Sequence, residues 1–457
     1  MRLRLTKAGR VVIFLLIAAV LCTGGYFGYR HVTGESPVEL IKNFGSDALG
    51  SNDEQTSAAG TGTQTVQQLK TSAPTIELSL DEWIGWKPII DANQGLTTQP
   101  GSIFDQLGIQ VNLHIINDAD ASSNALIKGD LNAAGYTINR TAFLSGKFKE
   151  SGLDVVMPVF TNYSNGGDGI IALNGFETIE SLKDATIGVP KYSEAQSLVI
   201  WFVNKSDLPD ADKQKIIDNL ILMDDAEQTG QAFFAGKLDV AATWQPFLSN
   251  AADSTNSHIL FDTTSSNKLI MDGILFRSDF AKAHADVVSA FIDGVIQARD
   301  LYETEFDYIR TVMPMFADAS DEDILGQCGD AGLMGYAENV NALENECPTV
   351  FADMCTIWES IGETTDRSLG ATLFDTSYVK ALSDKYSSLQ EKVSFEITEE
   401  QKESVRDVAA LLTKTATLNF IPDTAKFVDN AEADEVLKEF VDMAQTLDGT
   451  IIDEDSR

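Results

Sequence analysis

Aromatic and hydroxyl side chains stand at the ends of predicted strands in this sequence, where open α/β sheets bind small ligands. Residues 232–247 read AFFAGKLDVAATWQPF. A helix end closed by glycine is followed at 238–243 by a short apolar run, which is typical of a strand buried on both faces. Pro246 cannot continue a central strand, so the strand presents the Trp244 indole at its carboxyl end. Such a ring can stack on a flat heterocycle or contact a cation.

A second copy of this pattern lies earlier in the chain. Residues 125–137 read ALIKGDLNAAGYT, and Gly129 matches Gly236. The final pair, Tyr136–Thr137, falls where residues 243–244 fall. Two helix–glycine–strand units that end in aromatic and hydroxyl side chains predict two lobes facing one cleft. The alternative is that both are ordinary joints between a helix and a strand.

Three further positions are candidates for contact with a ligand. Residues 164–169 read SNGGDG, and glycines beside polar residues suit a backbone that bends between lobes, although a surface turn has the same composition. Ser193 is predicted to cap a helix, and a helix start also offers N–H groups to an anion. Asp168 or Asp272 could pair with an amine, while Asp272 with Gly273 also fits a simple turn.

Composition limits the function. The chain has 457 residues, 69 acidic against 33 basic, and a net charge of -36. This excess excludes nucleic acid as a partner, because phosphates need Lys and Arg. Three cysteines, Cys328, Cys347 and Cys355, lie close in sequence, and an extracytoplasmic location would permit one disulfide among them. No Cys/His spacing fits a zinc site.

The N-terminus predicts a membrane anchor. Four basic residues within 1–10 precede the uncharged stretch 11–29, which as a helix would rise about 28 Å and nearly cross a bilayer. The basic flank predicts that everything after it lies outside the cytoplasm. Residues 1–32 are therefore read as anchor, with a cleaved signal peptide as the alternative. Residues 33–75 have the composition of a flexible linker.

From residue 76 the chain alternates strands and helices, which predicts an α/β fold with a mainly parallel sheet. Strands are predicted at 76–80, 109–116, 131–137, 155–160, 170–173, 185–189, 222–224, 238–243, 258–261 and 269–276. Helices are predicted to end near 94 and to span 121–128, 179–184, 193–204, 213–220 and, as one long amphipathic helix, 280–302. Ser320 and Asp323, before Ile324, predict a helix capping box rather than a calcium loop.

Several of these segments resemble the nitrate/sulfonate/taurine/thiamine-precursor group of ABC-transporter substrate-binding proteins. The likeness covers about residues 75–362. The segments that carry it are 83–88, 125–137, 167–169, 181–184 and 244–247. The resemblance implies a two-lobed type II periplasmic-binding fold, a two-segment hinge, an ABC permease as partner, and neither a cofactor nor enzymatic activity. The implied lobes are 76–165 plus 268–362, and 166–267.

The resemblance also implies a binding site between the lobes, closed by hinge motion. The matching positions are Trp83, Trp86, Tyr136, Thr137, Asp168, Ser193, Trp244 and Asp272. The solute could be a heteroaromatic compound, an amine or a sulfonate. Because the polar candidates are neutral or acidic, sulfonate and nitrate are disfavoured. Core packing is the alternative for each aromatic residue, above all Trp86 and Tyr136.

Residues 363–457 are predicted to form a mainly helical extension. Within it, 418–425, 436–447 and 449–452 resemble the opening of an OmpA-like domain, which implies peptidoglycan as a further partner. This leaves a cell-envelope scaffold as an alternative function. A relative of the thiamine-pyrimidine synthases is the enzymatic alternative. It would need a His and a cysteine-rich motif near the cleft, and the sequence has no such motif.

Overall fold

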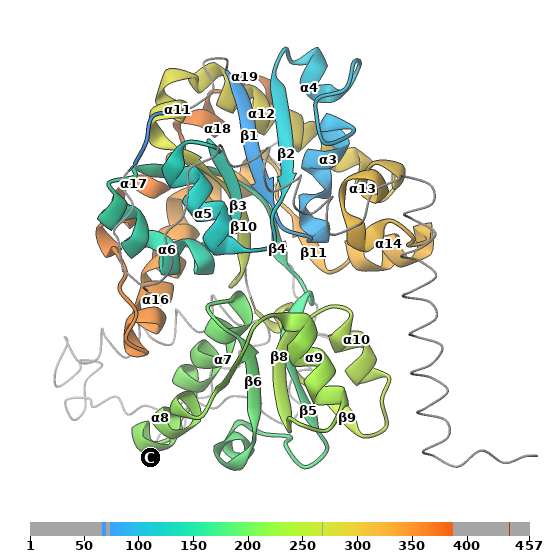
Figure 1. Cartoon of the computed structure of the whole chain (residues 1–457), viewed down its shortest axis with the longest axis vertical. Coiled ribbons are helices and arrows are strands. Elements are labelled where there is room, and N and C mark those ends of the chain that lie inside the picture. The colour runs from blue at the N-terminus through green and yellow to red at the C-terminus, as the bar shows by residue number, and fades with distance from the viewer. Residues whose placement is uncertain (1–65, 70–73, 267, 387–437, 439–457) are drawn as a thin grey trace, which may run out of the picture. The chain divides into compact units, whose positions relative to one another are not determined.

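The chain folds around two β-sheets, as a computed structural model shows (Figure 1). The structure describes residues 66–69, 74–266, 268–386 and 438. Sheet A has six strands in the order β11-β4-β10-β3-β1-β2. Its strands are β1 (Thr75–Leu80), β2 (Gln110–Ile115), β3 (Ala133–Thr137), β4 (Val155–Ser164), β10 (Met271–Arg277) and β11 (Ala331–Leu333). β1 runs parallel to β2 and β3, whereas β10 runs antiparallel to β3 and β4, and β11 antiparallel to β4. The prediction of a mainly parallel sheet is therefore wrong, because the strands that follow a change of sheet run against their neighbours.

Sheet B has five strands in the order β7-β6-β8-β5-β9. Its strands are β5 (Asp168–Leu173), β6 (Ile187–Pro190), β7 (Ile221–Met223), β8 (Val240–Trp244) and β9 (Ser257–Asp262). The associated helices are α7 (Glu194–Lys205), α8 (Asp210–Asp218), α9 (Ala226–Phe234) and α10 (Phe247–Ala252). The chain leaves sheet A after Ser164 and returns after Asp262, so two crossings join the sheets.

The repeated pattern forms equivalent strands in the two sheets. β3 lies between a parallel and an antiparallel neighbour, β1 and β10, and β8 lies likewise between β6 and β5. Gly129 and Gly236, which follow the preceding helices α5 (Ala119–Lys128) and α9, have φ of 72° and 70°. Glycine adopts this left-handed conformation at little cost. The predicted pair of helix–glycine–strand units is therefore present.

The helices around sheet A differ in part from the prediction. They are α3 (Lys87–Asn93), α4 (Ile103–Gln106), α5, α6 (Ile138–Ser151), α11 (Ser278–Ala283), α12 (Ala285–Ala298), α13 (Asp307–Val312), α14 (Asp321–Cys328), α15 (Tyr336–Asn341) and α16 (Cys347–Ser360). The prediction of a single long helix over residues 280–302 is wrong. His284 (φ −133°, ψ 47°) interrupts the helical backbone between α11 and α12. Helix α6, whose N-cap is Thr137, was not predicted from the sequence. The capping box of Ser320 and Asp323 is confirmed at the start of α14.

The three described cysteines are free, buried thiols, so the disulfide that the sequence permitted is not formed among them. Cys347 and Cys355 both lie on α16, and Cys328 ends α14. The Cys328 thiol donates to the Tyr302 carbonyl at 3.4 Å. Burial raises the pKa of the Cys328 and Cys355 thiols to about 11, which leaves little reactive thiolate at neutral pH.

The predictions for the two ends of the chain are only partly covered. The anchor at 11–29, the linker up to residue 65 and, apart from Lys438, the OmpA-like stretches lie outside the described residues. Among the residues that are described, no helix combines the length and apolar character needed to cross a bilayer. The described beginning of the C-terminal extension is helical, with α17 (Gly370–Leu373), α18 (Ser377–Lys380) and α19 (Ser383–Tyr386).

Candidate functional site

A cleft of about 600 Å³ is lined by residues from both sheets and the loops and helices that follow their strands. From the sheet A side come Asp81, Glu82, Trp83, Asn117, Thr137, Arg140, Ile270, Asp272 and Met315. From the sheet B side come Asp168, Pro190, Lys191, Ser193, Glu194, Asp224, Asp225, Ala226, Glu227, Trp244, Gln245, Pro246 and Phe247. Eight of these side chains are acidic and two are basic, so the cleft is strongly negative.

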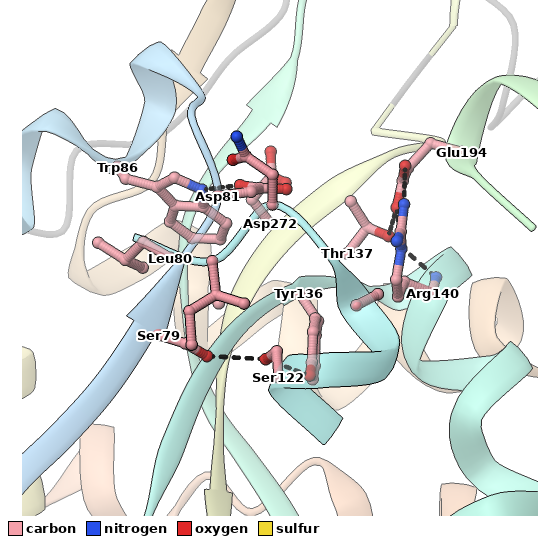
Figure 2. A pocket seen from close by; sticks show the side chains of 14 residues that line it. Ser79, Leu80, Asp81, Trp86, Ser122, Tyr136, Thr137, Arg140, Glu194 and Asp272 are labelled. Carbon is pink, nitrogen blue, oxygen red and sulfur yellow. Dashed lines mark hydrogen bonds and ion pairs between the residues drawn. The ribbon is translucent and has the colours of Figure 1, made fainter. Parts of the chain in front are cut away.

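Six of the eight predicted site residues line this cleft, and two do not. Trp86 and Tyr136 are buried, with exposed fractions of 1% and 6%. The Trp86 indole donates to Asp81 Oδ1 at 2.6 Å, and the Tyr136 hydroxyl bonds to Ser122 Oγ at 2.6 Å (Figure 2). Their polar atoms are bonded within the sheet A half, and both residues line a smaller recess beside the cleft rather than the cleft itself.

The remaining six are placed by strand pairing and helix capping. Thr137 ends β3 opposite Asp272 on β10, and Trp244 ends β8 opposite Asp168 on β5. Each sheet thus presents an aspartate beside the end of its repeated strand. Trp83 joins these groups because its indole donates to Asp272 Oδ2 at 3.2 Å. Ser193 caps α7 and accepts the Gln196 N–H, so its role in capping is filled within the helix.

Three aspartates in the cleft have a raised pKa and, in the described part of the chain, no basic partner. Burial raises the pKa of Asp272 well above its usual value, and the charges of Asp81, Asp168 and Glu194 raise it further. Burial raises the pKa of Asp168 to about 7. Burial also raises the pKa of Asp81. Many protein atoms surround the Asp81 carboxyl group, but its side chain still contacts the solvent of the cleft. Within the described residues, none of the three forms an ion pair with Lys or Arg.

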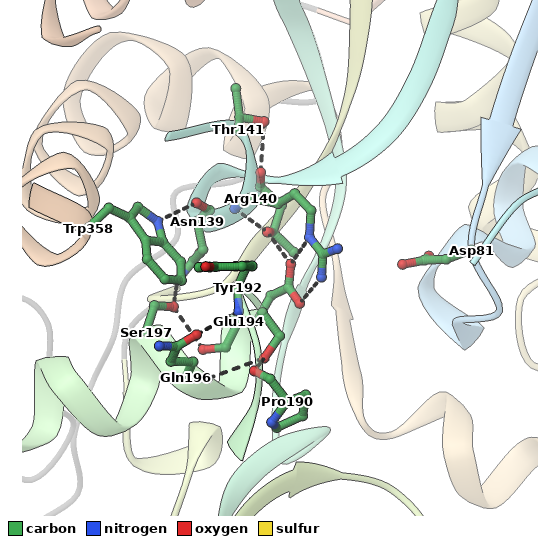
Figure 3. Close-up of polar contacts among 12 residues, drawn as sticks. Asp81, Asn139, Arg140, Thr141, Pro190, Tyr192, Glu194, Gln196, Ser197 and Trp358 are labelled. Atoms are coloured by element: carbon green, nitrogen blue, oxygen red, sulfur yellow. Dashed lines mark hydrogen bonds and ion pairs between the residues drawn. The ribbon is translucent and has the colours of Figure 1, made fainter. Parts of the chain in front are cut away.

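One ion pair links the two halves across the cleft (Figure 3). Arg140 on α6 donates from Nε and Nη2 to the two carboxylate oxygens of Glu194, at 3.1 and 2.9 Å. Thr137 Oγ1 donates to Glu194 Oε1 at 2.8 Å. Burial by itself would raise the pKa of Glu194, but the Arg140 charge and hydrogen bonds lower it. The Arg140 charge is therefore already balanced and leaves the aspartates unmatched.

Solved structures share this arrangement of two sheets. The periplasmic aliphatic sulphonate binding protein SsuA from Escherichia coli has a TM-score of 0.52 and 13% identity, and the match covers 67% of this chain and 99% of that protein. A protein described as the periplasmic sulfonate-binding protein SsuA from Methylobacillus flagellatus KT has a TM-score of 0.51 and 12% identity, covering 70% and 96%. This chain has a periplasmic-binding-protein fold. No family model and no curated protein sequence matches it.

The periplasmic-binding fold was predicted from segments 83–88, 125–137 and 244–247, and that prediction is confirmed for the described residues. Sequence reasoning nevertheless missed Asp81, Arg140 and Glu194. Asp81 directly follows the predicted strand 76–80, which was a usable signal. Glu194 follows Ser193 at the predicted helix start. The sequence contained no signal that Arg140 would line the cleft, because helix α6 was not predicted.

Carboxylates and indoles are the main chemical groups that this cleft presents. Throughout the described residues, no group of three or more His, Cys, Asp or Glu side chains is placed to hold a metal ion. Uncompensated carboxylates next to the Trp83 and Trp244 indoles suit an organic cation, because an indole face attracts positive charge. Sulfonate and nitrate would meet repulsion from the same groups.

The ligand-free protein is expected to lose stability as the pH rises from 4 to 8. The folded protein holds the Asp168 proton to a pKa of about 7, whereas the usual value is 3.8. Between these values the folded state binds more protons than the unfolded state, so the free energy of unfolding falls with pH. The loss from Asp168 is on the order of 4 kcal/mol at most. Urea unfolding at pH 5 and pH 8 measures it.

The matched control for this pH dependence is Asp168→Asn, which has no carboxyl proton to lose. In this variant the difference between pH 5 and pH 8 should shrink by the Asp168 contribution. Asp272 and Asp81 would still act in the same direction. A ligand-free protein that is more stable at pH 8 than at pH 5 would contradict the assignment of unmatched charge to this cleft.

Proposed function

We propose that this chain is the extracytoplasmic solute-binding component of an ABC importer. It captures a small molecule between two lobes, 76–165 plus 268–362 and 166–267, and releases it to a membrane permease. The observation that carries the proposal is the cleft itself, which both sheets line with aromatic and charged side chains. Concave sites between lobes, with apolar walls and a few polar groups, are typical of small-molecule binding.

Closure on the solute would use the two chain crossings as a hinge. The crossings are short, from Ser164 to Asp168 and from Asp262 to Met271. A few residues at element ends can absorb the rotation while each sheet moves as a rigid body. Arg140 and Thr137 meet Glu194 across the cleft, so these contacts would form on closure and break on opening.

The proposals of a location outside the cytoplasm and of a permease partner depend on the sequence. The basic flank before residues 11–29 favours an anchored chain with its binding lobes outside, and the fold is shared with periplasmic binding proteins. The enzymatic alternative loses support, because no His or Cys is among the described residues that line the cleft. Nothing in the described residues favours the scaffold alternative.

Replacing Trp244 with alanine should remove solute binding while preserving the fold. The first step is a thermal-shift screen of thiamine precursors, polyamines, taurine, alkanesulfonates and nitrate. A true solute at about 100 times its Kd should stabilise by about 2.7 kcal/mol. In Trp244→Ala we expect affinity for the hit to fall roughly 10-fold, because an indole contact of about 1–2 kcal/mol is lost. The quenching of tryptophan fluorescence by the hit should decrease, and Trp83 should account for what remains.

Trp201→Phe is the matched control for the Trp244 variant. Trp201 lies in the core with an exposed fraction of 2% and does not line the cleft. This variant removes an indole but should keep the affinity and the quenching. If Trp244→Ala binds the hit as tightly as the parent protein does, the solute binds elsewhere and the proposed site is wrong.

A further inference from the structure

A narrow recess opens beneath the sheet A side of the cleft. Its volume is about 20 Å³, and six of its lining residues also line the cleft (Figure 2). The shared residues are Asp81, Asn117, Thr137, Arg140, Glu194 and Asp272. A space of about 10–15 Å³ on this measure holds one water. The recess therefore accepts one group the size of a water molecule, and the wider cleft must hold the rest of any solute.

Hydrogen-bond acceptors remain available among the residues that line this recess. Asp81 accepts the Trp86 indole on Oδ1, and Asp272 accepts the Trp83 indole on Oδ2. These indole bonds use one oxygen of each carboxyl group, and a carboxylate oxygen can accept more than one hydrogen bond. Asp272 has an exposed fraction of only 5%, so bulk water solvates it poorly. Two carboxylates with spare acceptor oxygens thus line a space that fits a single small group.

Negative groups outnumber positive ones around the recess, because three carboxylates and one basic residue line it. Arg140, its only basic residue, holds Glu194 through two hydrogen bonds. The hydroxyls of Ser79, Ser122 and Tyr136 bond in a chain, with 2.8 Å between the serines and 2.6 Å between Ser122 and Tyr136. An incoming group that brings donors and a positive charge would therefore match the carboxylates.

Building on the solute-binding function proposed above, we infer that the solute is an organic cation whose primary ammonium group enters the recess between Asp81 and Asp272. An ammonium group has three N–H donors and is close to water in size. The body of the solute would lie in the cleft beside Trp83 and Trp244, with Asp168 on the opposite sheet supplying further negative potential. A sulfonate carries the wrong charge, and its three oxygens exceed the space.

The electrostatics of the empty site agree with this solute class. The groups that face Asp272 are Asp81, Asp168 and Glu194, with Arg140 engaged by Glu194, and burial with these charges raises its pKa. A cation bound beside Asp272 favours the ionised carboxylate, so binding releases protons. Affinity for an amine should therefore increase from pH 5.5 to pH 8, where the amine itself remains charged.

The test uses titration calorimetry on the full chain with probes that share one body. These are benzylamine, benzyltrimethylammonium and phenylmethanesulfonate, with butane-1,4-diamine as a second primary amine. We expect at least one primary amine to bind, more tightly at pH 8 than at pH 5.5. Benzyltrimethylammonium, which has the charge but is too large for the recess and lacks N–H donors, should bind more weakly than benzylamine. Phenylmethanesulfonate should not bind.

Variants locate the binding site of the amine. Asp272→Asn should weaken amine binding roughly 30-fold or more, because one partner of a buried charge pair is removed. Asp81→Asn should weaken amine binding less, because solvent reaches the Asp81 side chain. Asp239→Asn, outside the cleft, is the control and should bind normally. The inference is overturned if neither primary amine binds, if benzyltrimethylammonium binds as well as benzylamine, or if both recess variants keep their affinity. Sulfonate binding that is lost in Trp244→Ala would overturn it while leaving the solute-binding proposal intact.

Discussion

Asp272→Asn is expected to make the ligand-free protein more stable at pH 8. The native carboxylate is buried beside other acidic groups, and no basic side chain among the described residues pairs with it. The amide keeps an oxygen that can accept the Trp83 indole N–H but removes the charge. We expect a gain on the order of 1–3 kcal/mol, seen as a rise of several degrees in Tm. The gain should shrink as the pH falls, because protonation of the native carboxylate removes the same charge.

Asp293→Asn is the matched control, with the opposite expected sign. Asp293 is buried to a similar extent, with an exposed fraction of 7%. Its carboxylate accepts from Lys385 Nζ at 2.6 and 2.8 Å and from the Tyr386 hydroxyl at 2.5 Å. Neutralising this paired carboxylate should lower Tm at the same pH. A loss of stability in Asp272→Asn comparable to that in Asp293→Asn would show that Asp272 has a stabilising partner.

Arg140→Met is expected to give the largest loss of stability among the cleft variants. It leaves the Glu194 carboxylate with only the Thr137 hydroxyl as a side-chain partner. Removing one member of a buried ion pair costs about 3–5 kcal/mol, and we expect about 2–3 kcal/mol here because solvent reaches this pair in part. Urea unfolding measures the loss. Small-angle scattering should show a larger radius of gyration, since the pair joins the two halves.

The double variant Arg140→Met/Glu194→Gln separates the pair from its neighbours. Removing both charges should recover much of the lost stability, because no unpaired carboxylate remains. Lys147→Met is the surface control. Its ion pair with Asp120 is exposed, so the change should stay within about 0.5 kcal/mol. If Arg140→Met unfolds at the same urea concentration as Lys147→Met, the link across the cleft contributes nothing.

The architecture was predictable because its signals are local. Glycines at 129 and 236, apolar runs and strand-ending polar residues each depend on a few neighbouring positions, and each is found where the sequence placed it. The order of strands could not be read from these signals. The insertion of β10 between β3 and β4 joins segments more than a hundred residues apart, and only the family resemblance indicated a return to the first lobe.

The differences between the predicted residues and the observed lining of the cleft have one physical cause. Residue type predicts what a side chain can do but not which neighbour satisfies it. Trp86 and Tyr136 were equally suited to stacking, but Asp81 and Ser122 bind their polar atoms. Arg140 and Glu194 lie on helices of different halves, and their pairing exists only in the folded chain. The strongest electrostatic contact of the cleft was therefore invisible in the sequence.

The path of the chain through the two sheets sets an order for biosynthesis. The strands of sheet B come from one continuous stretch of sequence. Sheet A cannot be completed until β10 is synthesised, and β10 follows every strand of sheet B in the chain. Domains generally fold as units, and the N-terminal part of a chain is synthesised first. Strand pairing between segments that lie far apart in the sequence is slow. Sheet B should thus fold while the strands β1 to β4 remain unfinished. Because Asp272 arrives on β10, the proposed solute site cannot assemble until every strand of sheet B has been made.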